Sequence, residues 1–206
     1  MSRGSTERSA ARGEEIINAC ESLYQTMSFK EITLGEISAA TGCTRTLIYH
    51  YFQTKEEIFL ALFAREYDSW TADLEEIGTL KGTRDREMLA GALATSLQKR
   101  ELMLRLLSVN LYDMEENSRM ERLTAFKVSY GNSCETLRRL MRSWYPGISE
   151  DDLQSFMLSF LPLLHGVYPY AHATAKQKEA MEKAGVTFVK WSVYKLVYQS
   201  LLKILP

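Results

Sequence analysis

The sequence predicts an all-α protein in which a small helix-turn-helix unit precedes a larger helical domain. Apolar residues recur at steps of three and four along most of the chain, and no segment shows the alternation that is typical of a strand. Several of these stretches begin with Ser or Thr followed three residues later by an acidic residue, which is a helix start signal. A chain of 206 residues has room for a helix-turn-helix domain at residues 1–56 and a larger helical domain at 57–206.

The N-terminal unit is predicted to contain three helices. Apolar side chains spaced by three and four residues indicate a first amphipathic helix over Glu14–Met27. Thr33 can cap a short second helix that runs into Gly42, where a glycine supplies the positive φ of a sharp turn. Thr44 can cap a third helix that extends to Phe52. Two short helices therefore meet at a tight corner.

The rest of the chain is also predicted to be helical. Thr54, with Glu57 three residues later, starts a long helix that leads out of the small unit. Pro162 and Pro169 are expected to kink or interrupt the helix in which they lie. Four further helices are predicted at residues 85–109, 118–144, 149–172 and 186–205, with a Lys- and Glu-rich separator at 175–185.

Composition places the chain among soluble globular proteins. It is 46% hydrophobic and 25% charged, and no apolar run reaches the roughly 18 residues that a membrane span needs. The polar stretch from Met1 to Arg12 lacks the apolar centre of a secretory signal, which favours a cytoplasmic location. The formal net charge of -1 gives no overall attraction to nucleic acid, so DNA binding would depend on where individual charges lie.

No set of residues suggests a metal site, a cofactor or a catalytic centre. Cys20, Cys43 and Cys134 lie far apart within helical patterns, which favours reduced thiols over a disulfide or a zinc site. His165 and His172 have no nearby Cys, Asp or Glu that would complete a set of metal ligands. The sequence also lacks a phosphate-binding glycine loop, an HExxH motif and a serine elbow. We therefore expect neither a cofactor nor enzymatic activity.

The third helix begins with side chains that are suited to reading DNA. Arg45 can donate two hydrogen bonds to a guanine, and Thr46 can contact a base or a thymine methyl group. Hydroxyl, imidazole and ammonium groups that follow can donate to phosphates and so position the protein. The predicted interface consists of Thr33, Thr44, Arg45, Thr46, Leu47, Tyr49, His50, Tyr51 and Lys55. The alternative is that these residues only form the core and surface of a three-helix unit.

A family resemblance rests on residues 37–52, which read ISAATGCTRTLIYHYF, and on the Lys-Glu pair at 55–56. With its turn glycine and aromatic run, this stretch resembles the helix-turn-helix of the tetracycline-repressor (TetR) family of transcriptional regulators. The resemblance covers residues 14–60 and implies that the remaining chain forms a helical domain that binds a ligand and dimerises. Departures from the family pattern, which concern operator preference, are Ser28, Ser38, Thr41 and Cys43.

The last predicted helix points to a homodimer. It has two apolar faces, one of which includes Val193 and Leu196, and only a narrow polar stripe. A helix that is apolar nearly all round must be covered on two sides, which favours pairing with a second copy beside the helix predicted at 149–172. The alternative is that the helix is buried within one monomer.

Large, adaptable apolar side chains with two polar anchors are typical of a pocket for a small molecule. The predicted lining residues are Met103, Leu107, Asn110, Phe126, Tyr130, Met157, Leu161 and His165. Core packing is the alternative for each of them. The acidic cluster of Asp113, Glu115, Glu116 and Asn117 is expected to favour the start of the helix at Ser118 rather than to bind a cation.

These observations lead to a hypothesis about function. The chain is expected to be a DNA-binding transcriptional regulator, a repressor that a largely apolar small-molecule effector releases from its double-stranded operator. The alternative is a helical small-molecule-binding or interaction protein that does not bind an operator. A third reading, an enzyme that uses His165, lacks a recognisable acidic partner.

Overall fold

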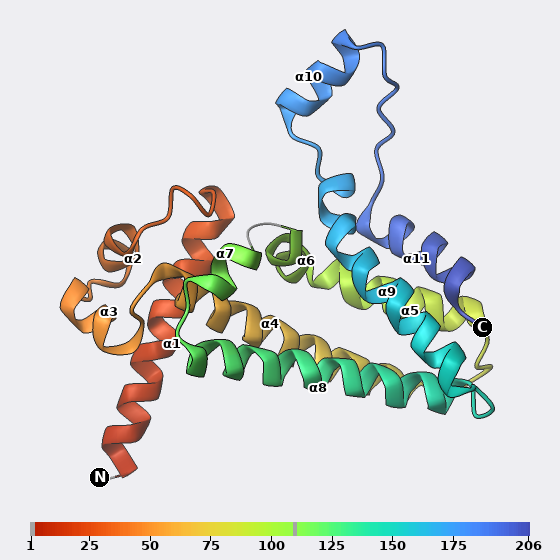
Figure 1. Cartoon of the computed structure of the whole chain (residues 1–206), viewed down its shortest axis with the longest axis horizontal. Helices are drawn as coiled ribbons and strands as arrows, with labels where there is room; N and C mark the ends of the chain where they lie inside the picture. The colour runs from red at the N-terminus through yellow and green to blue at the C-terminus, as the bar shows by residue number, and fades with distance from the viewer. Residues whose placement is uncertain (1–2, 109–110) are drawn as a thin grey trace. The chain divides into compact units, whose positions relative to one another are not determined.

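The computed structural model describes residues 3–108 and 111–206, and these residues form helices and no strand (Figure 1). The prediction of an all-α protein is confirmed. In chain order the helices are α1 (Arg3–Thr26), α2 (Leu34–Thr41), α3 (Arg45–Tyr51), α4 (Lys55–Gly78), α5 (Arg86–Lys99), α6 (Glu101–Ser108), α7 (Leu111–Glu116), α8 (Met120–Trp144), α9 (Glu150–Ala171), α10 (Ala175–Lys183) and α11 (Val193–Ile204).

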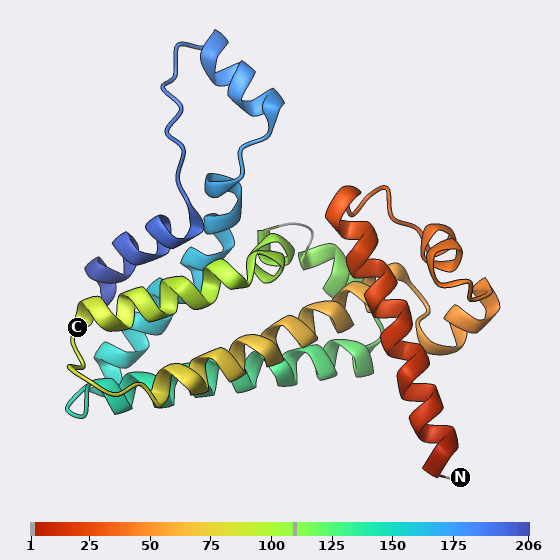
Figure 2. The ribbon, with the colours of Figure 1, turned by 180° about the vertical axis from the view of Figure 1, so that it is seen from behind.

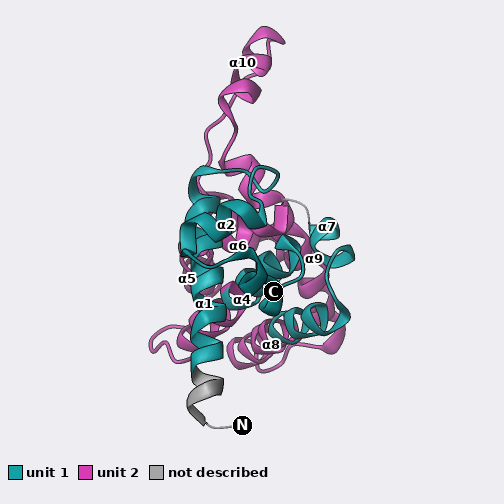
Figure 3. Ribbon diagram, turned by 90° about the vertical axis from the view of Figure 1, so that its left-hand side faces the viewer, with its two compact units in different colours: residues 1–65, 109–130 teal, residues 66–108, 131–206 magenta. Residues whose placement is uncertain are grey.

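The chain divides into two compact units, each built from two stretches of sequence (Figure 3). Unit 1 comprises residues 1–65 and 109–130, and unit 2 comprises residues 66–108 and 131–206. Helices α4 and α8 therefore each supply residues to both units. The boundary between two consecutive domains at residue 56 stays a prediction.

Unit 1 has an aromatic cluster that joins α1 to α4, and its two short helices are anchored by buried isoleucines. Tyr24 of α1 meets Phe59 of α4 edge-on with ring centroids 5.1 Å apart, and Phe29 packs against the same ring at 4.7 Å. Ile37 of α2 and Ile48 of α3 are both fully buried. Because α2 and α3 each bury an apolar residue, these short helices are held by packing rather than by their own length.

The local signals of the helix-turn-helix occur where the sequence indicated them. Thr33 accepts hydrogen bonds from the backbone N–H groups of Gly35 and Glu36, so it caps α2. Gly42 closes that helix in the left-handed conformation, with φ of 69°. Thr44 accepts from the N–H of Leu47 and caps α3. Both predicted caps and the turn glycine are confirmed, although α1 begins at Arg3 rather than at residue 14.

The prediction of a single helix at 85–109 is wrong in one respect, because Arg100 divides this stretch into α5 and α6. The backbone of Arg100 leaves the helical region at φ of -107° and ψ of 40°. Its guanidinium donates to both carboxylate oxygens of Asp73 on α4, at 2.7 and 3.0 Å, and to the carbonyl of Ser69. This bidentate pair holds the break in place. The predicted end at Val109 lies outside the described residues.

The C-terminal part of unit 2 differs from the sequence prediction in three ways. Helix α9 continues through Pro162 and Pro169, so neither proline interrupts it, and the alternative that they kink the helix stays a prediction. The predicted separator forms α10, whose capping box pairs Thr174 with Gln177. The last helix begins at Val193 rather than at residue 186, because Ser192 accepts from the N–H of Lys195 and caps it there.

Nowhere in residues 3–108 and 111–206 does a helix have the length and apolar character needed to span a bilayer.

Candidate nucleic-acid interface

Helix α3 has one buried face and one exposed face. Ile48 is fully buried and Phe52, which follows the helix, is 2% exposed. Arg45, Thr46 and Tyr49 lie on the opposite side and are exposed, Tyr49 to 54%. The spacing of a helix thus directs the apolar residues into the core and the hydrogen-bond donors outward. A short helix with exposed donors in its first turn is the element that enters a major groove in helix-turn-helix proteins.

The predicted interface residues Thr33 and Arg45 meet at Gly35. A Cβ atom added to Gly35 would lie 2.5 Å from Nη2 of Arg45 and 3.2 Å from Oγ1 of Thr33. The guanidinium of α3 therefore lies across the first turn of α2, where a larger residue would displace it. This arrangement brings a positive charge and a hydroxyl group together beside the N-terminus of α2. Both are suited to contact phosphate or a base edge, and these contacts stay predictions.

The remaining predicted residues occupy different environments. Thr44 and His50 are exposed, whereas Leu47 and Tyr51 are half-buried. The His50 ring meets the Tyr51 ring edge-on, with centroids 5.3 Å apart. The exposed pair can reach a ligand without rearrangement, while Leu47 and Tyr51 also contribute to packing.

Lys55 has a structural role that the sequence did not indicate. Its ammonium donates to the carbonyl oxygens of Phe29 at 2.6 Å and Ile32 at 3.0 Å, and it lies 4.3 Å above the Phe29 ring. The side chain thus connects the start of α4 to the segment between α1 and α2. Because an ammonium has three donors, one hydrogen remains for the predicted phosphate contact.

Replacing Lys55 with methionine is expected to lower the free energy of unfolding by about 2 kcal/mol, because two carbonyls lose a charged donor. If the third hydrogen also binds a phosphate, the salt dependence of DNA binding becomes shallower by about one unit. Chemical unfolding and salt titrations measure the two effects separately. The control is Lys30→Met in the same connecting segment, where the lysine is exposed. Unchanged stability in the Lys55 variant would contradict the structural role.

The far end of α3 is held by arginines of the α8 region, all within unit 1. The backbone carbonyl of Tyr51 accepts a hydrogen bond from Nη2 of Arg122 at 2.7 Å and a longer one from Nη2 of Arg119 at 3.4 Å. The Arg122 guanidinium also lies 4.8 Å from the centre of the Phe52 ring. Cations at a helix C-terminus interact favourably with the helix dipole. The sequence interpretation missed both arginines.

A buried carboxylate, Glu57, links this contact to the start of α4. Its Oε1 accepts from the backbone N–H and Nε of Arg119 at 3.1 and 2.6 Å. Its Oε2 accepts from Nη2 of Arg119 and from the backbone N–H of Gln53, both at 2.8 Å. The side chain of Glu57 is 0% exposed. Burial acts to raise the pKa of this carboxyl, but the hydrogen bonds from Arg119 and Gln53 outweigh it and hold the pKa below its ordinary value.

The predicted helix start at Ser118 is wrong because the cap comes from elsewhere in the chain. Ser118 donates its hydroxyl to the carbonyl of Met114, at the end of α7. Helix α8 begins two residues later, and the N–H of Arg119 before it is satisfied by Glu57. The acidic residues at 113–116 belong to α7, a separate helix before α8, and Glu115 pairs with Lys127 at 2.6 Å.

The predicted effector residues are distributed over both units. Phe126 and Tyr130 belong to unit 1, Asn110 lies outside the described residues, and the others belong to unit 2. In unit 2, Nδ1 of His165 on α9 lies 3.2 Å from the carbonyl oxygen of Leu107 on α6. Residues that are buried within unit 2 are Met103, Leu107 and Met157, whereas Leu161 is half-buried. The effector site stays a prediction.

Cys20 and Cys43 are buried in unit 1, Cys134 is half-buried, and no disulfide joins these three described residues. Burial raises the pKa of the Cys20 thiol to about 12, so it stays protonated at neutral pH. Arg12 donates to the sulfur of Cys43 at 3.7 Å. Within the residues that the structure describes, no three His, Cys, Asp or Glu side chains gather as metal ligands would.

A capped pair of short helices around a left-handed glycine, with an outward-facing second helix, defines a helix-turn-helix DNA-binding protein. Comparison with family models agrees with this class. Residues 16–62 match the model of bacterial regulatory proteins of the tetR family, and residues 64–204 match the model of the tetracyclin repressor-like C-terminal domain. The chain belongs to the TetR family of transcriptional regulators.

Solved structures share the fold. The TetR family transcriptional regulator PfmR from Thermus thermophilus is 14% identical, with a TM-score of 0.60 over 92% of this chain and 96% of that one. A TetR-family regulator from Mesorhizobium loti is also 14% identical, with a TM-score of 0.62 over 96% of both chains. No curated protein matched the sequence.

Proposed function

We propose that the chain is a ligand-responsive repressor in the cytoplasm, released from its operator by a small, largely apolar effector. The observation that supports this proposal is the arrangement of the two ends of α3. At its start Arg45 and Thr46 are exposed for base contacts, and at its end the Tyr51 carbonyl is bound by α8. The position of the reading helix thus depends on a helix outside the helix-turn-helix. The proposed activity is binding, without a chemical step or a cofactor.

In this proposal, effector binding and operator binding are linked equilibria. Helix α8 is continuous from Met120 to Trp144, and its residues belong to both units. An effector that binds more tightly to one arrangement of α8 changes the fraction of molecules in which α3 is positioned to bind DNA. The effect on operator affinity equals the effector's differential affinity for the two arrangements, typically about 1–3 kcal/mol.

A homodimer supplies the second reading helix. Two α3 helices would enter successive major grooves about 34 Å apart, so the operator would have two related half-sites. The outer face of α9 is the surface we propose for pairing, because Leu158 at its middle is 66% exposed. Of the two residues that the sequence suggested for the interface, Val193 is 2% exposed and packs in the core of its own unit, and Leu196 is half-buried.

Arg45→Ala tests the DNA-reading part of the proposal. The substitution is expected to weaken binding to the operator by about 1–3 kcal/mol and to leave binding to random DNA nearly unchanged, because a base contact is lost. Titration of labelled duplexes from the promoter of the protein's own gene, beside a shuffled duplex, gives both values. Equal loss on both duplexes would assign Arg45 to phosphate. A wild-type chain that does not distinguish the duplexes would favour a small-molecule-binding protein without operator binding.

A further inference from the structure

The segment from His172 to Ser192, called here the arm, extends away from the other helices of its unit. It contains α10, and both views show it apart from α5, α9 and α11 (Figures 1 and 2). None of the nine residues of α10 is buried. A helix of this length is not stable alone in water, so most of its stability must come from a covering surface.

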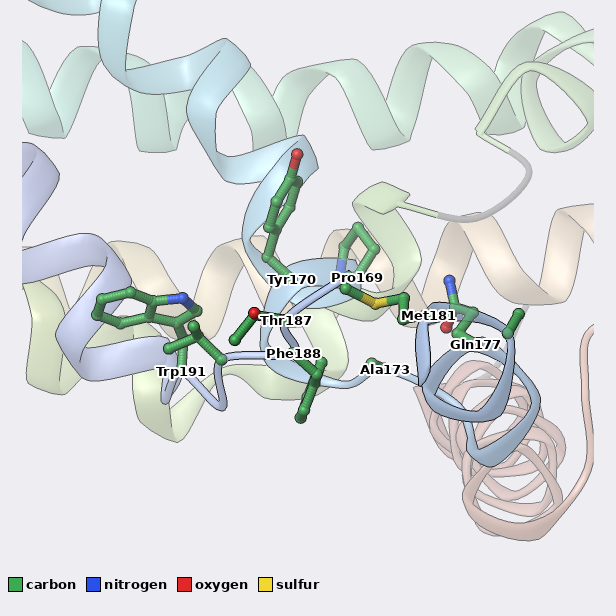
Figure 4. Close-up of a pocket in the computed structure, with 10 residues that line it drawn as sticks. Pro169, Tyr170, Ala173, Gln177, Met181, Thr187, Phe188 and Trp191 are labelled. Carbon is green, nitrogen blue, oxygen red and sulfur yellow. The ribbon is translucent and has the colours of Figure 1, made fainter. Parts of the chain in front are cut away.

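The inner side of the arm is apolar. Together with the end of α9 it borders a cavity of about 590 Å³ (Figure 4). Aromatic and apolar side chains form most of the wall, including Tyr170, Met181, Phe188 and Trp191. Tyr170 is 71% exposed and Val189, on the same wall, is 51% exposed. Side chains of this kind exposed together usually belong to an interface.

The face of α9 that leads to the arm has the composition of an interface core. Its exposed positions follow the helical repeat, and the stripe consists of Asp151, Ser155, Leu158, Pro162, His165 and Pro169. No Asp, Glu, Lys or Arg occurs between residues 153 and 175. Depletion of charge is what distinguishes the centre of a protein interface from ordinary surface. The part of this exposed face from Ser155 to Pro169 therefore has the composition of a surface that a protein partner covers.

The two-fold symmetry of a dimer determines which part of the second copy lies beside the arm. Helix α9 has 22 residues, and Leu158 and Pro162 lie on either side of its midpoint. If two copies pair through this stripe, the two-fold axis passes near these residues and the two α9 helices run antiparallel. The base of each arm then lies beside the first turn of α9 in the other copy.

The charges at these two places are opposite. The arm carries Lys176, Lys178, Lys183 and Lys190 against two glutamates, whereas the first turn of α9 carries Glu150, Asp151 and Asp152. Within the chain Glu150 pairs with Arg142 at 2.9 Å and Lys183 pairs with Glu179 at 2.5 Å, whereas Lys176, Lys190 and Asp151 have no ion-pair partner among the described residues. We infer that the arm packs on a second copy of this chain. Its apolar side covers the end of the α9 stripe in that copy, and its lysines contact the acidic first turn of the same helix. This inference rests on the proposed dimer.

A charge exchange tests the inference. One full-length variant carries Lys176→Glu with Lys190→Glu, and the other carries Glu150→Lys with Asp151→Lys. Each variant alone is expected to raise the dimer dissociation constant about tenfold or more, because like charges then face each other in both symmetric contacts. Mixed in equal amounts, the two variants are expected to form a heterodimer, and all four changes in one chain are expected to restore the homodimer. Sedimentation velocity over a concentration series measures the dissociation constants, and labelled chains report the heterodimer.

The outcomes separate this inference from the dimer on which it rests. The control Lys81→Glu with Lys99→Glu reverses two exposed lysines outside the arm and is expected to leave the dimer unchanged. A wild-type chain that is monomeric at every concentration would refute the proposed dimer itself. A wild-type dimer that neither variant weakens, or variants that weaken it without rescue in the mixture, would overturn the arm contact and leave the dimer standing. If the cavity holds a small apolar molecule instead of the second copy, the expected result is a wild-type dimer that neither variant weakens.

Discussion

Glu57→Ala is expected to destabilise unit 1 by about 3 kcal/mol. The substitution removes the acceptor of two backbone N–H groups, those of Gln53 and Arg119, and leaves the guanidinium of Arg119 without its main partner. Loss of one member of a buried ion pair typically costs about 3–5 kcal/mol. The lower end applies because the side chain of Arg119 is 33% exposed and can be rehydrated.

Chemical unfolding followed by circular dichroism measures this loss. The control is Glu121→Ala, since Glu121 also contacts Arg119, at 3.0 Å, but is 68% exposed. An exposed pair contributes at most about 1 kcal/mol, so the control is expected to change stability little. Equal effects from the two substitutions would contradict the view that Glu57 is the buried centre of the contact.

The lowered pKa of Glu57 also fixes the direction of a pH dependence. A carboxyl whose folded-state pKa lies below its unfolded value stabilises the fold above the unfolded pKa, about 4.3 for glutamate. This contribution decreases as the pH falls below that value and is lost below the folded-state pKa. The wild-type protein is therefore expected to lose more stability than Glu57→Gln between neutral and strongly acidic pH. A constant difference between the two proteins across this range would contradict the assignment.

The helix-turn-helix could be predicted from sequence because its determinants are local. Thr33 and Thr44 bond to N–H groups within three residues of themselves, and Gly42 is needed for its own backbone conformation. The start of α10 was missed although its signal is equally local. Thr174 and Gln177 stand at capping-box spacing, but the many charged residues around them suggested a separator.

Two other errors concern helix ends that distant residues determine. The break at Arg100 is held by Asp73, and the N–H of Arg119 is satisfied by Glu57. In each case the partner lies on another helix, so no pattern within the segment reveals it. The contact of Arg122 with the Tyr51 carbonyl was missed for the same reason. Among the predicted DNA-binding residues, Lys55 shows the related difficulty that a lysine expected to bind phosphate can instead stabilise its own fold.

Leu158→Asp is expected to convert the proposed dimer into a folded monomer. Because Leu158 lies near the two-fold axis, the substitution brings two carboxylates together in a desolvated interface, at a cost of several kcal/mol. In the monomer the position is 66% exposed, so the fold should tolerate aspartate. A single reading helix then binds each half-site independently, and operator affinity falls at least about a hundredfold.

Sedimentation velocity, helical circular dichroism and operator titration must be measured on the same preparation. The matched control is Val128→Asp, which also places aspartate at an exposed apolar position, 57% accessible, but on α8 rather than α9. This variant is expected to remain a dimer that binds the operator. A Leu158→Asp protein that stays dimeric would move the pairing surface to another face of unit 2. A folded monomer that still bound the operator with wild-type affinity would show instead that pairing through α9 is not what places the two α3 helices on DNA.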